Sequence, residues 1–126
     1  MIAIASDDKL ERVIATVPAG TRWTTFTDAV LTAIENAPAF VRYNWIIDDQ
    51  GPMDDVDVPG VGRVGEAFRR LAGGSERPTF TIVVTTDRFF ETWARVIDRH
   101  HGARRHLAAP SLDGAVSLLD RLEDRS

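Results

Sequence analysis

Cysteine is absent from this chain of 126 residues, which excludes structural disulfides, thiolate metal sites and cysteine nucleophiles. Lysine is almost absent as well, since Lys9 is the only one of the 15 basic residues that is not an arginine. The arginines create no positive excess, because the formal net charge is −4 and acids and bases are mixed along the chain. The charge balance therefore predicts no binding to nucleic acid.

Long apolar runs are also missing. No segment reaches the length that a membrane-spanning helix requires, so we expect no membrane insertion. Residues 1–6 lack the basic segment that opens a signal peptide, which predicts a cytoplasmic location. Hydrophobic residues make up 44% of the chain and charged residues 27%, which is typical of a folded protein. At this length, one domain over residues 1–126 is expected.

The common catalytic motifs are absent too. The chain has no Gly-x-Ser-x-Gly elbow, no Walker loop and no Gly-x-Gly-x-x-Gly after the first predicted strand. Its serines fall at predicted turns, helix caps or termini. We therefore predict a protein that is not an enzyme, with no catalytic residues, no cofactor and no metal.

The residues that are present alternate between strand and helix patterns. Residues 2–5 and 10–17 are predicted strands joined as a hairpin, and a helix follows with Trp23, Phe26 and Val30 on its apolar face. Thr24 or Thr25 could cap that helix, and Pro38 closes it. Residues 41–47 are the most apolar stretch, which is typical of a strand buried on both faces.

The second half repeats this alternation. A second helix ends at Gly73-Gly74, and residues 80–85 form a strand. A third helix begins at Asp87 and ends at Gly102. Residues 106–108 form a short edge strand, and Ser111 caps a last helix. The predicted order is β-β-α-β-α-β-α-β-α. It indicates an α/β fold with a mostly parallel sheet, an antiparallel edge strand and helices packed on it.

Asp57-Val58-Pro59-Gly60-Val61-Gly62 opens the second helix. With the element order, this stretch resembles the STAS superfamily of anti-sigma-factor-antagonist domains, in particular the stage II sporulation AA-like stand-alone bacterial domains. Their switch motif reads Asp-Ser-Ser-Gly-Leu-Gly. The resemblance implies a regulatory module that binds a protein partner, and some relatives are thought to hold small or lipid-like ligands. Pro59 stands where the family has its phosphorylatable serine, so a kinase-operated switch is not expected here.

The same stretch has a physical interpretation. Pro59 suits the first turn of a helix, and free N–H groups at a helix start can receive an anion or a carboxylate of a partner. The alternative is a junction whose glycines only allow tight packing. We expect a docking surface here, formed by Asp54, Asp55, Asp57, Pro59, Gly60 and Gly62.

The acids around this surface admit two interpretations. Asp48, Asp49, Asp54, Asp55 and Asp57 follow the central strand, at the sheet edge where α/β folds bind ligands. Their spacing matches no EF-hand pattern, and neither a partner histidine nor a phosphate-binding loop accompanies them. We therefore favour a solvated acidic surface over a metal site used in hydrolysis.

Two further clusters deserve a prediction. Most aromatic residues fall on apolar faces and are expected in the core, but Trp23, Phe26 and Trp93 could line a pocket for a small apolar ligand. His100, His101 and His106 lie among arginines. Adjacent histidines point in different directions on a helix, so we assign them to a basic helix end, with a small anion-binding patch as the alternative.

These observations favour a regulatory domain that binds a protein, while a carrier or sensor of a small apolar or lipid-like ligand is the alternative. A homodimer is compatible with either function.

Overall fold

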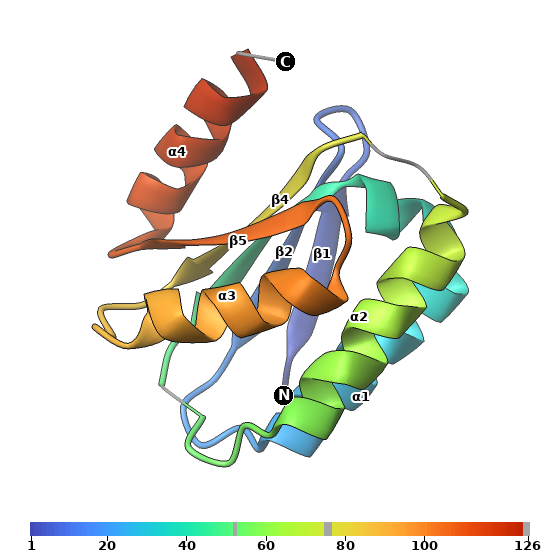
Figure 1. The fold of residues 1–126 in the computed structure, drawn as a ribbon. Coiled ribbons are helices and arrows are strands. Elements are labelled where there is room, and N and C mark those ends of the chain that lie inside the picture. Colours follow the sequence, from blue (N-terminus) through green and yellow to red (C-terminus); the bar gives the residue numbers. More distant parts are fainter. Residues whose placement is uncertain (52, 75–76, 125–126) are drawn as a thin grey trace.

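The computed structural model describes residues 1–51, 53–74 and 77–124. It is an α/β fold with a five-stranded mixed sheet and four α-helices, as the sequence predicted (Figure 1). The strands are β1 (Ala3–Asp7), β2 (Arg12–Val17), β3 (Asn44–Asp49), β4 (Thr79–Val84) and β5 (Arg104–Ala109). The helices are α1 (Trp23–Asn36), α2 (Val58–Ala72), α3 (Phe90–His100) and α4 (Leu112–Asp124). No helix in the described parts of the chain has the length and apolar character needed to cross a membrane.

The strands lie in the sheet in chain order, from β1 to β5. β1 pairs antiparallel with β2, and all other neighbours are parallel. Because right-handed crossovers between parallel strands taken in order keep to one side, α1, α2 and α3 belong to one face of the sheet. α4 follows the last strand and packs on the opposite face, against β3, β4 and β5 (Figure 1).

Two apolar clusters follow from this layering. The larger one joins α1 and α2 to the sheet, with Val13, Trp45 and Phe68 among its buried members. The smaller one joins α4 to the other face through Ile46, Ile82 and Leu119. Ile46 and Trp45 are neighbours in β3 that point to opposite faces, so this strand is buried on both sides.

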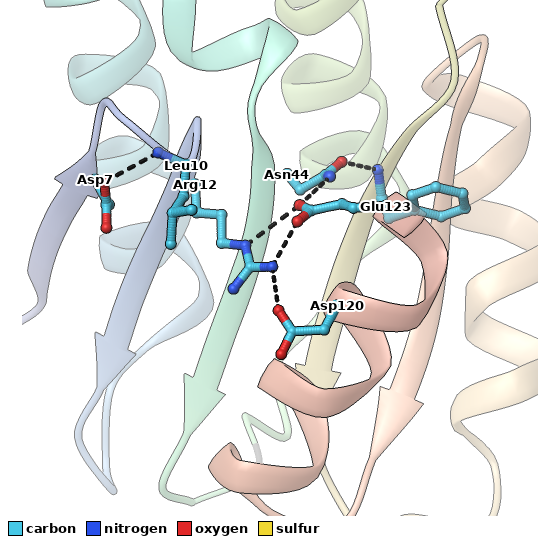
Figure 2. Close-up of polar contacts among 7 residues, drawn as sticks. Asp7, Leu10, Arg12, Asn44, Asp120 and Glu123 are labelled. Atoms are coloured by element: carbon cyan, nitrogen blue, oxygen red, sulfur yellow. Dashed lines mark hydrogen bonds and ion pairs between the residues drawn. The ribbon is translucent and has the colours of Figure 1, made fainter. Parts of the chain in front are cut away.

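A polar network fastens α4 to the sheet, as Figure 2 shows. The Arg12 guanidinium binds the carboxylates of Glu123 and Asp120, the latter at 2.6 Å. The Asn44 amide donates to Glu123 at 2.8 Å and its oxygen accepts the Phe80 N–H at 2.8 Å. These carboxylates raise the pKa of Arg12, foremost through the hydrogen bond to Glu123. The network therefore fixes α4 to its own face of the sheet, at the amino ends of β2 and β3.

Two local predictions were confirmed and two were wrong. Gly73 ends α2 in the left-handed conformation, with φ of 63°, and the Ser111 hydroxyl accepts the Gly114 N–H at the start of α4. The predicted strand over 41–47 begins later. Residues Pro38–Arg42 instead form a short 3₁₀-helix, η1, which the Trp45 indole N–H fixes by donating to the Phe40 carbonyl at 2.8 Å.

The predicted cap of the first helix was also wrong. Thr24 and Thr25 lie inside α1, and Arg22 at the N-cap position makes no side-chain capping bond. The carboxylate of Asp55 takes this role from across the fold, accepting the Trp23 backbone N–H at 3.0 and 3.2 Å. A carboxylate suits this position because it meets free N–H groups and the positive end of the helix.

Candidate functional site

A pocket of about 340 Å³ lies between the sheet and helices α1, α2 and α3. This volume falls in the range of small-molecule sites, roughly 300–1,000 Å³. Trp23 and Phe26 from α1 and Trp93 from α3 all line it. The structure thus brings together the three residues that the sequence suggested for a pocket, and its occupation by a ligand stays a prediction.

The floor of the pocket follows from the strand register. Trp45, Thr81 and His106 are cross-strand neighbours on β3, β4 and β5 and form its first row. Ile47 and Val83 form an apolar second row, two residues further along the strands. Asp49 and Thr85 lie beyond them, at the carboxyl end of the sheet. The floor is therefore apolar in the middle and polar at both ends.

Two aromatic residues of the α3 wall lie outside the apolar clusters, although Ile97 of the same wall packs against the larger one. Trp93 and Phe90 are half-buried and belong to neither apolar cluster, whereas Trp23, Phe26 and Trp45 are buried in the larger one. Trp93 therefore lies in the pocket wall, as the sequence suggested, and outside the core. Phe89, at the N-cap position of α3, is 73% exposed. Phe90 and Trp93 therefore form a wall that is more exposed to solvent than the core residues beneath it.

The amino end of the pocket holds two buried histidines. His101 is 8% exposed and His106 7% exposed, and their ring centroids lie 4.7 Å apart. Burial lowers the pKa of His101 to about 2 and that of His106 to about 3. Both rings are therefore neutral at physiological pH. His101 does lie at the C-cap of α3, as the predicted basic helix end requires, but it is buried and uncharged. His106 lies on β5 instead.

The two histidines differ in their partners. His106 Nδ1 lies 2.9 Å from the Asp98 carboxylate. Because the ring is neutral, this contact is a hydrogen bond donated by Nδ1–H rather than an ion pair. His101 Nδ1 is buried and has no hydrogen-bond partner in the described chain. Buried polar atoms normally have partners, so His101 Nδ1 is an exception, shielded from solvent with its hydrogen-bonding capacity unsatisfied.

Arg104 supports this end of the pocket from below. It is 3% exposed, and its guanidinium donates to Thr81 Oγ1 at 2.8 Å and to the carbonyls of Val41 and Tyr43 at 3.0 and 2.6 Å. It also lies over the Phe68 ring, 4.9 Å from the centroid. Burial lowers the pKa of Arg104 to about 9, so it remains a cation at neutral pH.

The predicted docking surface is built differently from our expectation. Asp57 caps α2 by accepting the Gly60 N–H at 2.7 Å, and it also accepts the Trp23 indole N–H at 3.2 Å. Because Asp55 accepts the backbone N–H of Trp23, two aspartates bind this one residue of the pocket wall. Asp55 and Asp57 are exposed, as a solvated acidic surface requires, but they also stabilise the fold through these bonds, which the sequence analysis did not anticipate. Asp54 is exposed and makes no hydrogen bond within the described chain.

The glycines of this surface serve packing. Gly60 is buried, and a Cβ there would overlap the Trp23 indole nitrogen and crowd the Asp57 carboxylate. The space at Gly60 is therefore filled by this chain and is closed to a partner. Gly62 is half-buried, and a Cβ there would make ordinary contact with the His100 ring. Pro59 lies in the first turn of α2 and is exposed, in keeping with the predicted helix start.

The carboxyl end of the pocket is acidic. Asp49, Asp54 and Asp87 line it. Burial raises the pKa of Asp49, and the nearby Asp48 adds to this effect, while the bond from the Gly51 N–H opposes it. No group of three or more His, Asp or Glu residues in the described segments is arranged to hold a metal ion. Carboxylates therefore dominate the lining at this end of the pocket.

Sequence reasoning missed the two buried histidines and Asp49 as pocket residues. The strand period was the available signal, because His106 and Asp49 point to the same sheet face as Trp45 once the register is known. Comparisons with protein-family models, with curated proteins and with solved structures found no match for this chain.

Proposed function

We propose that this protein binds a small, largely apolar molecule in the pocket beneath α1, α2 and α3, as a carrier or sensor rather than as a catalyst. The observation that supports it is a pocket of about 340 Å³ with apolar and aromatic walls and a few polar groups at its two ends. Apolar walls with a few polar groups are typical of sites that bind small molecules. The resemblance to STAS domains agrees with this proposal, since some of them are thought to hold such ligands.

Two neighbouring valines offer a matched test. Val83 points into the pocket, whereas Val84 points to the other face and packs against the α4 cluster. Val83→Phe should fill the pocket and abolish binding of the neutral fluorescent probe N-phenyl-1-naphthylamine. Val84→Phe adds the same volume on the opposite face and should leave binding unchanged. Equal probe binding by Val83→Phe and the wild type, with both folded, would refute the proposal.

A docking site for a protein partner is a second candidate. Val58 is 50% exposed on the first turn of α2, next to the exposed Pro59, and so presents apolar surface to solvent. The STAS resemblance supports this candidate too. Val58→Ser should weaken association with a co-purifying protein, while Leu112→Ser, at an exposed site on α4, should not. If both variants retain the partner equally, this surface is not its binding site.

A further inference from the structure

The pocket has a direction along the strands. Trp45 and Asp49 lie four residues apart on β3, which corresponds to about 13 Å along a strand. The neutral histidines lie at the Trp45 end, and the carboxylates lie at the Asp49 end. An elongated ligand therefore meets uncharged polar groups at one end and acidic groups at the other.

The charge at the acidic end is unbalanced. Asp49, Asp54 and Asp87 line the pocket there, and no lysine or arginine is among its described lining residues. Arg88 follows Asp87 in the chain but is exposed and lies outside the lining. The carboxylates disfavour a ligand with a negatively charged group and favour one with a positive group.

The position of Asp49 strengthens this preference. Its carboxylate is half-buried, and its hydrogen bond from the Gly51 N–H is long, at 3.4 Å. Partial removal from water raises the pKa of this group, because its charged form lacks adequate stabilisation. A cation placed beside it would supply that stabilisation.

The surroundings favour an organic cation over a metal ion. Metal-ligand groups are not found in the described segments, whereas Phe90 and Trp93 line the pocket on the helix that follows Asp87. Aromatic rings attract organic cations through their negative faces. The apolar second row, Ile47 and Val83, would hold the uncharged body of the ligand.

We propose that the natural ligand is an amphipathic organic amine whose apolar body lies over Ile47 and Val83 and whose ammonium group lies beside Asp49 and Asp54. This inference rests on the proposed function, since it assigns a chemical class to the ligand of that pocket.

The test compares three probes that share one alkyl chain. Decylamine is a cation at pH 7, 1-decanol is neutral and decanoate is an anion. Isothermal titration calorimetry should rank their affinities in that order for the wild type. Asp49→Asn should weaken decylamine binding about tenfold, as the loss of a charge-assisted contact predicts, and should leave 1-decanol unchanged.

Asp48→Asn is the matched control. It removes the same charge from the neighbouring residue of β3, which does not line the pocket, so decylamine affinity should change less than about twofold. Val83→Phe reports any binding outside the pocket. Equal affinities for the three probes, tightest binding of decanoate, or an equal effect of both Asn variants would overturn the amine assignment while leaving the pocket function intact. If neither 1-decanol nor N-phenyl-1-naphthylamine binds, the proposed function itself fails.

Discussion

Removal of the two aspartates that hold Trp23 should destabilise the whole fold. Asp55 caps α1, and Asp57 caps α2 and accepts the Trp23 indole N–H. Loss of a capping side chain costs about 1 kcal/mol, and loss of one further hydrogen bond costs about 0.5–1.5 kcal/mol. The double variant Asp55→Ala/Asp57→Ala should therefore lose about 3 kcal/mol of unfolding free energy. That loss is large beside a typical total of roughly 5–15 kcal/mol.

Urea unfolding followed by far-UV circular dichroism measures this loss without relying on tryptophan fluorescence, which the substitutions would alter. Asp55→Asn/Asp57→Asn keeps an acceptor oxygen at each position and should lose about 1–2 kcal/mol, mainly through the helix-end charge. Asp54→Ala is the control and should change stability by less than about 0.5 kcal/mol, because the side chain is exposed. If the Ala double variant is as stable as the Asp54→Ala control, the capping roles assigned to Asp55 and Asp57 are incorrect.

Three other predictions concern packing and pH. Gly60→Ala should destabilise the protein by about 1–3 kcal/mol, because the new Cβ overlaps the Trp23 indole. Gly62→Ala should stabilise α2 by about 0.5–1 kcal/mol. Chemical unfolding of the two variants measures this difference, and equal effects on stability would contradict the packing role of Gly60. Trp93→Ala should cost about 1–2 kcal/mol, less than the 3–5 kcal/mol typical of a fully buried tryptophan, and a loss in the larger range would place this residue in the core. The free energy of unfolding should fall as the pH drops from about 6.5 toward 3, because His101 and His106 stay neutral in the fold, with pKa values of about 2 and about 3, while the unfolded chain binds protons at both. His101→Phe should flatten this dependence. An unchanged pH profile of this variant would argue against a buried neutral ring at position 101.

Sequence patterns predicted the fold class because its signals are local. The alternation of strand and helix periods, the glycine end of α2 at Gly73 and the Ser111 cap each depend on residues within one or two turns. The 3₁₀-helix at Pro38–Arg42 was missed because its apolar residues resemble the start of a strand. Its conformation depends on the Trp45 indole bond to the Phe40 carbonyl, which becomes visible only in the folded chain.

The candidate site was harder to predict because its contacts are distant in sequence. Asp55 caps a helix that begins 32 residues before it, and no spacing rule connects the two. The arginine-rich surroundings of His101 and His106 suggested a charged surface, but the strand register turns His106 inward and α3 delivers His101 beside it. The aromatic pocket residues could be named from helical spacing, whereas the separation of Trp93 from the core depends on how α3 packs.

The most direct test of the ligand pocket is an NMR experiment on protein with labelled isoleucine and valine methyl groups in the presence of 1-decanol. Ile47, Val83 and Ile97 line the pocket, while Ile46 and Ile82 are buried on the α4 face and provide internal controls. The proposed function predicts intermolecular nuclear Overhauser effects from the decanol chain to Ile47, Val83 and Ile97 and none to the control pair. Contacts to Ile46 and Ile82 instead, or no contact to the three pocket residues at saturating decanol, would contradict it.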